Sequence, residues 1–237
     1  MSIGKYLSRL YRGKTMIRKK LISISGLDGA GKTSTINELI NIAASSNIPI
    51  KYVWGSYELI LLKPIVRLGQ FLFLRKSNQF RDYTGYYNCI KRLSKKSILS
   101  KTYEILTLLE YTIQVIFKIT IPYMIGKKII ICDRYYYDVF VSLAVTLSYT
   151  KSELKKKLKI FSWFYPKPDY AFLLDIPEEI SFNRKNDIPS IEYLKQRRNL
   201  YIEIAKEYGM KILDGTKDVK TNAEIIFNNV IKEEGKK

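Results

Sequence analysis

The chain has 237 residues, 46% of them hydrophobic, which is typical of one α/β domain with a continuous buried core. Its 41 Lys+Arg against 22 Asp+Glu give a net charge of +19, which favours phosphates, nucleic acids or anionic membrane surfaces as partners. The absence of histidine excludes histidine catalysis and His-ligated metals. Cys89 and Cys132 form neither a metal motif nor a disulfide framework, and no signal peptide is visible, so we expect a cytoplasmic location.

Residues 1–20 form a basic N-terminal extension to a single domain over residues 21–237. The extension holds seven cations and no acid, and Ile3, Leu7 and Leu10 recur at helical spacing. Such a basic amphipathic helix is suited to an anionic membrane or RNA, or to packing its apolar stripe on its own domain. We prefer packing, because a lone basic stripe gives weak support for a partner.

A phosphate-binding loop follows the first predicted strand. Residues 26–33 read GLDGAGKT after an apolar run at 21–25, a full match to G-x-x-x-x-G-K-[ST]. The glycines allow successive N–H groups to wrap an anion, and the following helix directs its positive end to the same place. We therefore expect ATP here, with Lys32 at its β- and γ-phosphates and Mg²⁺ at the Thr33 hydroxyl. The predicted ATP-binding residues are Gly26, Gly29, Ala30, Gly31, Lys32, Thr33 and Ser34.

Further strands and helices alternate along the chain, which predicts one doubly wound sheet. Helices are predicted over residues 34–45 and 151–164, and strands over 48–54, 128–132, 170–175 and 210–214. The strand at 128–132 delivers Asp133 and Arg134 to its carboxyl end, where open α/β sheets bind ligands. Asp133 is therefore predicted to help hold Mg²⁺ through water, and the planar fork of Arg134 suits a phosphate.

Residues 58–76 and 105–125 are apolar but interrupted, so neither is expected to span a membrane. In the second stretch, Glu110, Gln114 and Lys118 lie four residues apart and share one stripe of an otherwise buried helix. We expect this stripe to line a site rather than to face solvent, because burying a charge without a partner is costly.

Two basic segments lie on either side of the predicted Asp133 strand. Residues 77–101 are rich in tyrosine and cations and suit either nucleic acid or, as we prefer, a solvated face near an anionic substrate. Residues 183–190 are polar and precede a helix that carries Arg197 and Arg198. We expect a lid around 183–198 that closes over phosphates, although a plain loop has the same pattern.

Together these stretches resemble the thymidylate kinase family of nucleoside monophosphate kinases. The matching parts are 26–35, 133–138, 172–179, the 184–198 segment with Glu192 and Tyr201, and 214–216. The Asp-Arg-Tyr triplet at 133–135 is the most specific, since related deoxynucleoside kinases usually carry Glu-Arg-Ser there. The resemblance implies an α/β fold of the P-loop NTP hydrolase type. Its five-stranded parallel sheet has the order 2-3-1-4-5 and is flanked by helices, often in a homodimer.

The resemblance also implies roles for individual residues. ATP with Mg²⁺ would phosphorylate a nucleoside monophosphate, with Asp28 at the acceptor sugar and Arg134 at the acceptor phosphate. Family members with glycine at the position of Gly29 supply a catalytic arginine from the lid, which nominates Arg184. The predicted catalytic residues are Lys32, Asp133, Arg134 and Arg184.

The base-binding region departs from the family pattern. Trp-Gly-Ser-Tyr at 54–57 stands where relatives have an Arg-Glu-Pro-Gly-Gly-like turn. The stacking phenylalanine and the base-reading arginine of the family align with Glu110 and Gln114. We expect Gln114, with Glu110 and Tyr111 beside it, to bind a pyrimidine monophosphate, dTMP first.

Two other functions stay open from the sequence. One is a P-loop kinase of a non-nucleotide phosphorylated or anionic metabolite, which the altered base region favours. The other is an ATP-binding regulatory or nucleic-acid-binding module, which the net charge of +19 favours.

Overall fold

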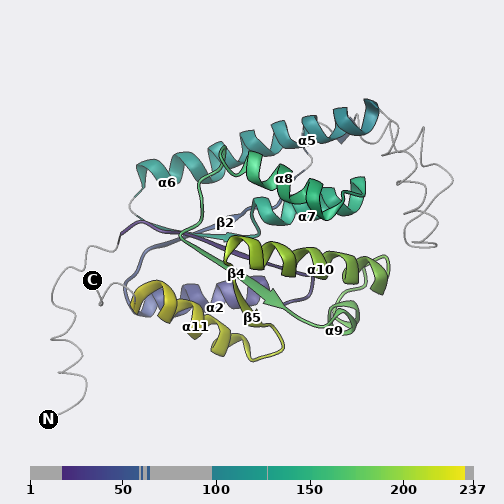
Figure 1. The fold of residues 1–237 in the computed structure, drawn as a ribbon. Coiled ribbons are helices and arrows are strands. Elements are labelled where there is room, and N and C mark those ends of the chain that lie inside the picture. The colour runs from purple at the N-terminus through teal and green to yellow at the C-terminus, as the bar shows by residue number, and fades with distance from the viewer. Residues whose placement is uncertain (1–17, 59, 61–62, 65–97, 127, 233–237) are drawn as a thin grey trace, which may run out of the picture.

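The computed structural model describes residues 18–58, 60, 63–64, 98–126 and 128–232 (Figure 1). Its centre is a sheet of five parallel strands in the order β2-β3-β1-β4-β5. The strands are β1 (Leu21–Gly26), β2 (Ile50–Trp54), β3 (Ile129–Asp133), β4 (Tyr170–Asp175) and β5 (Lys211–Asp214). This arrangement confirms the predicted fold class and strand order.

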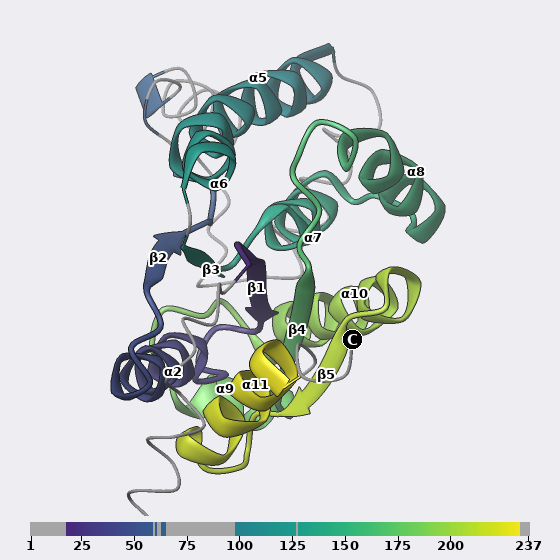
Figure 2. The same cartoon turned by 90° about the vertical axis from the view of Figure 1, so that its left-hand side faces the viewer.

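Helices cover both faces of the sheet (Figures 1 and 2). On one face, α2 (Lys32–Ser45) and α11 (Val219–Lys232) pack against each other. The other face is covered by α7 (Tyr136–Leu147) and α10 (Ile191–Tyr208), with α5 (Ile98–Val115) beyond them. The remaining helices are η1 (Ile116–Thr120), α6 (Ile121–Ile125), α8 (Lys151–Phe161) and α9 (Glu178–Asn183). The result is the three-layer architecture that strand–helix alternation predicts.

The two sides of the sheet have different cores. The core under α2 and α11 is almost entirely aliphatic. The core under α7 and α10 is rich in buried tyrosine, namely Tyr111, Tyr135, Tyr136, Tyr137, Tyr165 and Tyr201. A buried tyrosine hydroxyl needs a hydrogen-bond partner. Several of these hydroxyls find one near the carboxyl ends of the strands, so the second core reaches the edge where ligands bind.

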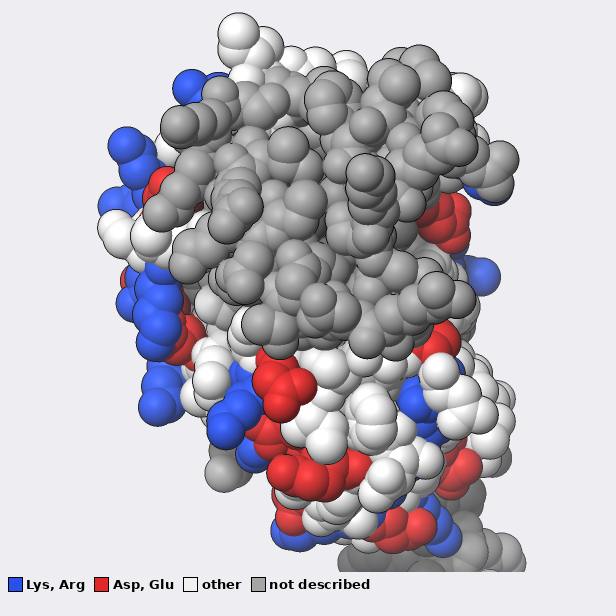
Figure 3. All heavy atoms as spheres, turned by 90° about the vertical axis from the view of Figure 1, so that its right-hand side faces the viewer, with Lys and Arg blue, Asp and Glu red and all other residues white. Residues whose placement is uncertain are grey.

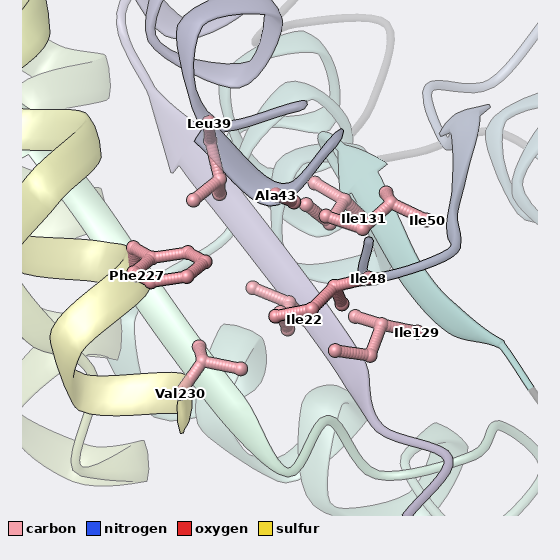
Figure 4. A pocket seen from close by; sticks show the side chains of 9 residues that line it. All are labelled: Ile22, Leu39, Ala43, Ile48, Ile50, Ile129, Ile131, Phe227 and Val230. Atoms are coloured by element: carbon pink, nitrogen blue, oxygen red, sulfur yellow. The ribbon is translucent and has the colours of Figure 1, made fainter. Parts of the chain in front are cut away.

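A small hollow lies in the aliphatic core (Figure 4). Nine side chains line it, and all nine are apolar: Ile22, Leu39, Ala43, Ile48, Ile50, Ile129, Ile131, Phe227 and Val230. Ile22 and Ile129 lie near the amino-terminal ends of their strands, whereas the phosphate-binding loop follows the carboxyl end of β1. We therefore interpret the hollow as a packing gap, because it offers no polar group that orients a substrate.

Most predicted element boundaries agree with the structure to within three residues, but the long apolar helix predicted from residue 105 begins at Ile98. The helix predicted from residue 34 begins at Lys32, directly after Gly31 in a left-handed conformation. The strands predicted from 48 and 210 begin at Ile50 and Lys211, and the helix predicted to end at 164 ends at Phe161. The predicted segment 77–101 and the basic extension lie almost entirely outside the described residues, so their roles stay predictions.

The long apolar helix differs from its prediction in shape. Predicted as one stretch over 105–125, it comprises α5, a π-helical turn at η1, and α6. Pro122 lacks an N–H group, and its ring crowds the carbonyl group four residues earlier, at Lys118 within η1. A local change to π geometry is a common response to such crowding.

The prediction that this helix is buried apart from its polar stripe is correct for one face, where Leu108, Tyr111 and Val115 are buried, and wrong for another. The exposed fractions of Leu109, Ile113 and Phe117 are 57%, 48% and 67%, whereas Glu110 is only 5% exposed. The polar stripe and one apolar stripe therefore face the protein, and a second apolar stripe faces outward. By length and composition alone, Ser100–Ile125 qualifies as a membrane-crossing helix, with 33% of its apolar window buried. A single helix of this kind gives weak support for a membrane protein.

Candidate active site

The loop between β1 and α2 has the backbone conformation that phosphate binding requires. Gly29 and Gly31 have φ angles of +81° and +84°, which residues with a Cβ rarely adopt. Such angles allow neighbouring N–H groups to converge on an anion at the positive end of α2. Of the other predicted loop residues, Ala30 is buried, whereas Thr33 and Ser34 are exposed in the first turn of the helix.

Lys32 lies folded back onto this loop. Its ammonium group donates hydrogen bonds to the carbonyl oxygens of Gly26 (3.0 Å) and Leu27 (2.6 Å), and the residue is 5% exposed. Burial, followed by the positive charge of Arg134, lowers the pKa of Lys32 to about 8. A bound phosphate would compensate the ammonium charge and raise this pKa again.

Asp133 and Thr33, the two residues predicted to hold Mg²⁺, meet between β3 and α2. The Thr33 hydroxyl donates to Oδ2 of Asp133 at 2.6 Å. The other carboxylate oxygen, Oδ1, is buried and has no hydrogen-bond partner within the described residues. Burial raises the pKa of Asp133, which a bound cation would reverse. Hydroxyl and carboxylate oxygens are ligands that suit Mg²⁺, so these residues fit the ion.

Arg134 is held in a left-handed conformation directly after β3. Its φ angle is +68°, which is uncommon for a residue other than glycine. Its N–H group donates to the carbonyl of Ile24 at 3.0 Å, and a Cβ placed on Gly55 would lie 2.2 Å from the Arg134 carbonyl oxygen. The guanidinium pairs with Asp28 and, at 3.3 Å, with Oδ1 of Asp138. Strained backbone held by its surroundings is typical of residues that act on ligands.

Asp138 is a residue of this site that our sequence reasoning did not nominate. Its carboxylate is 2% exposed and also accepts hydrogen bonds from the hydroxyls of Ser25 (2.7 Å) and Tyr201 (2.8 Å) and from the N–H of Tyr135 (3.0 Å). The sequence did contain a signal for this role. Asp138 follows Asp-Arg-Tyr in the first turn of a helix, where a carboxylate can accept hydrogen bonds from the N–H groups at the start of the helix. Asp138 fixes the direction of Arg134.

Arg184 lies over the phosphate-binding loop. Its Nη1 donates to the carbonyl of Gly29 at 3.0 Å, and a Cβ on Gly29 would lie 3.3 Å from the Cβ of Arg184. The nearby Ser181 hydroxyl donates to the carbonyl of Asp28 at 2.6 Å. These contacts bring the start of the predicted lid onto the loop. The later part of the predicted lid, from Ile191 onward, belongs to α10.

The predicted base-reading residues of α5 contact the turn after β2. The Gln114 amide accepts from the N–H of Glu58 (3.3 Å) and donates to its carbonyl (2.6 Å). Glu110 accepts from the hydroxyl of Tyr57 (2.9 Å) and from the N–H of Ile60 (2.8 Å). Both side chains therefore have protein partners, and their role in base recognition stays a prediction.

Tyr111 of α5 and Lys118 of η1 also hold this turn, and together with Glu110 and Gln114 they form a clamp on it; a pocket lies beside the clamp. Tyr111 is buried and its hydroxyl donates to the carbonyl of Gly55 at 3.1 Å, while Lys118 pairs with the Glu58 carboxylate at 2.8 Å. The pocket between the turn, α5 and α7 has a volume of about 110 Å³. It is lined by Ser56, Tyr57, Tyr103, Thr107, Val139, Ser142, Leu143 and Thr146.

The sheet edge thus brings together the loop lysine, a carboxylate–hydroxyl pair and two arginines from different segments. Such a set binds phosphate groups and neutralises their charge, and it includes no nucleophile or histidine base. The fold and site define a P-loop phosphotransferase.

Comparison with known proteins supplies the family. A thymidylate kinase family model matches residues 86–226, more than half of the chain. A probable thymidylate kinase 1 of Saccharolobus solfataricus is 27% identical over 84% of this chain and 90% of its own length. A thymidylate kinase of Prochlorococcus marinus (strain MIT 9312) is 28% identical over 92% and 95%. The chain belongs to the thymidylate kinase family and is an ATP-dependent nucleoside monophosphate kinase.

The depressed pKa of Lys32 predicts proton uptake when ATP binds. At pH 8 about half of the ligand-free molecules carry a neutral Lys32, and a bound phosphate restores the charge, so about 0.5 proton enters per ATP. Uptake falls toward zero as the pH drops well below 8, because the lysine is then already protonated. Calorimetry in buffers of different ionisation enthalpy, with EDTA present, measures this number.

Lys32→Met is the control and should take up no proton at pH 8. If the wild-type protein binds ATP at pH 8 to 9 without proton uptake, Lys32 is fully charged in the free protein and the prediction is wrong.

Proposed function

We propose that the protein transfers the γ-phosphate of ATP to a pyrimidine nucleoside monophosphate, with dTMP as the preferred acceptor. The observation that carries the proposal is the meeting of Lys32 and Thr33 with Asp133 and Arg134 at one edge of the sheet. The names of the relatives from Saccharolobus and Prochlorococcus support dTMP as the first acceptor to test.

The residues act by positioning and charge, because phosphoryl transfer passes through a loose transition state with little proton chemistry. In our proposal the loop from Gly26 to Ser34 holds the ATP phosphates. Lys32 and Arg184 neutralise charge on the transferred group, Arg134 holds the acceptor phosphate in line, and Asp28 orients the acceptor sugar. The lack of histidine in the chain is compatible with such a reaction.

Thr33 and Asp133 would hold Mg²⁺, the latter through water. When bound, the ion neutralises charge on the phosphates. Within the described residues, no group of three or more His, Cys, Asp or Glu side chains is placed to hold a metal. A single carboxylate and one hydroxyl nonetheless suffice for Mg²⁺, which keeps several waters and takes other ligands from substrate phosphates.

A coupled assay of ADP release tests the function. We expect turnover with dTMP and lower rates with other nucleoside monophosphates. Lys32→Ala should reduce kcat by at least about 100-fold, since single charge-stabilising donors contribute that much. Retention of turnover within tenfold in Lys32→Ala contradicts the role of the loop. ADP release only with non-nucleotide metabolites supports the alternative kinase, and none with any acceptor supports a regulatory module.

Gln114→Ala tests whether Gln114 holds the turn after β2 or reads the acceptor base. The hydrogen bonds to Glu58 favour a role in holding the turn, so we expect the variant to lose about 1–3 kcal/mol of stability and to slow all acceptors alike. Base reading by Gln114 instead predicts a changed order of preference among the monophosphates. Urea unfolding and kcat/KM for dTMP, dUMP and dCMP, with Lys118→Ala as a control for the turn, distinguish the two roles.

We further propose a cytoplasmic homodimer that forms through the outward stripe of α5. Leu109, Ile113 and Phe117 lie at four-residue spacing and are about half exposed or more, and a contiguous apolar face of this kind usually marks an interface. A two-fold dimer would cover the same face on both copies. On its described part, the surface seen from the right of Figure 1 carries Lys and Arg interspersed with Asp and Glu (Figure 3).

Sedimentation equilibrium tests this assembly. We expect a dimer for the wild type and a monomer for Leu109→Glu with Ile113→Glu, since two buried carboxylates would oppose association. A wild-type monomer, or binding of the wild type to lipid vesicles that the double variant loses, contradicts the proposal.

A further inference from the structure

Arg197 on α10 is a buried cation whose partners are tyrosines. The residue is 6% exposed, and its Nη1 and Nη2 donate to the hydroxyls of Tyr193 (2.6 Å) and Tyr201 (3.3 Å). The two rings lie 5.3 Å and 5.9 Å from the guanidinium carbon. Within the described part of the chain, no carboxylate lies within ion-pair distance of Arg197, and its buried Nε has no hydrogen-bond partner.

The neighbouring Arg198 differs from Arg197 because its partners are carboxylates. Arg198 donates to both oxygens of Asp175 (2.7 and 2.8 Å) and to Glu178 (2.8 Å), so its charge is compensated within the fold. Arg134 likewise has Asp28 and Asp138 as partners. Cation–π contacts offset only part of the penalty for burying a charge, which amounts to several kcal/mol. The contacts of Arg197 in the ligand-free protein therefore do not explain why this buried charge is stable, and a bound anion would compensate it.

Arg197 lies beside the acceptor end of the active site. Its partner Tyr201 donates to Oδ1 of Asp138, the same oxygen that accepts from Arg134. Burial raises the pKa of Asp28, but the charges of Arg134 and then Arg197 outweigh it and hold that pKa below its usual value. The two guanidinium groups therefore act on one carboxylate, at the point where the acceptor phosphate must enter.

We propose that Arg197 is a second binding residue for the acceptor phosphate and that it acts together with Arg134. The proposal rests on the function proposed above. Two guanidinium groups match the two charges of a phosphate monoester, and the Nε–H of Arg197 supplies a donor that has no partner among the described residues. Asp28, which pairs with Arg134 in the free protein, would give way to the phosphate and turn to the acceptor sugar.

The test measures the two substrates separately. In Arg197→Leu we expect the KM for dTMP to rise at least about tenfold, because a hydrogen bond to a charged group is lost, while the KM for ATP stays within twofold. Arg197→Lys keeps the positive charge but lacks the planar guanidinium group, so its KM for dTMP should lie between those of the wild type and Arg197→Leu. Arg198→Leu is the matched control on the same helix, and it should lower thermal stability without raising the KM for dTMP relative to that for ATP.

A second measurement is independent of turnover. Inorganic phosphate should stabilise the wild-type protein and Arg198→Leu against heat, and this gain should shrink in Arg197→Leu and in Arg197→Lys. If no nucleoside monophosphate is a substrate, the proposed function fails, while the phosphate titration still decides the role of Arg197. If Arg197→Leu does not fold, Arg197→Lys carries the test. Unchanged phosphate stabilisation and an unchanged KM for dTMP in the folded variants would show that Arg197 only supports packing.

Discussion

The arrangement of the active-site edge depends on the buried carboxylate of Asp138. It accepts hydrogen bonds from β1 through Ser25, from the backbone at the start of α7, from α10 through Tyr201, and from Arg134. A buried charge with donors on several sides is stable only when all of them are in place. The strand β1, the Asp-Arg-Tyr segment and the helix α10 therefore share one fixed arrangement, and the direction of Arg134 follows from it.

In our proposal, two tasks are separated around this carboxylate, the binding of the phosphate donor and the binding of the acceptor. Lys32 and Arg184 lie at the loop that takes the phosphate donor, and Arg134 and Arg197 lie on the side of the tyrosine-rich core. All four side chains already lie at this edge in the free protein, and such preorganisation is how electrostatic catalysis limits rearrangement during the reaction. The clamp on the turn after β2 also helps to hold this edge. Tyr111 donates to the carbonyl of Gly55, and Gly55 packs against the backbone carbonyl of Arg134.

Local motifs were enough to predict the loop residues and the Asp133–Arg134 pair, because glycine spacing and a strand end fix their positions along the chain. The strand order came from the family resemblance, which carries long-range information that a single sequence pattern lacks. The partners of Gln114 were not predictable, since alignment gives a residue's place but not the backbone it meets. The exposure of Leu109 and the burial of Arg197 escaped prediction because both depend on contacts between distant segments.

The ion pair between Asp28 and Arg134 joins the ATP-binding loop to the residue that we assign to the acceptor. An acceptor that separates this pair changes the charge and the freedom of the loop, so it also changes the affinity for ATP. Thermodynamic linkage makes the effect mutual, because ATP must alter the affinity for the acceptor by the same factor. If the acceptor separates this pair, as we propose, the two substrates are energetically coupled through it, and the apparent dissociation constant of each depends on the concentration of the other.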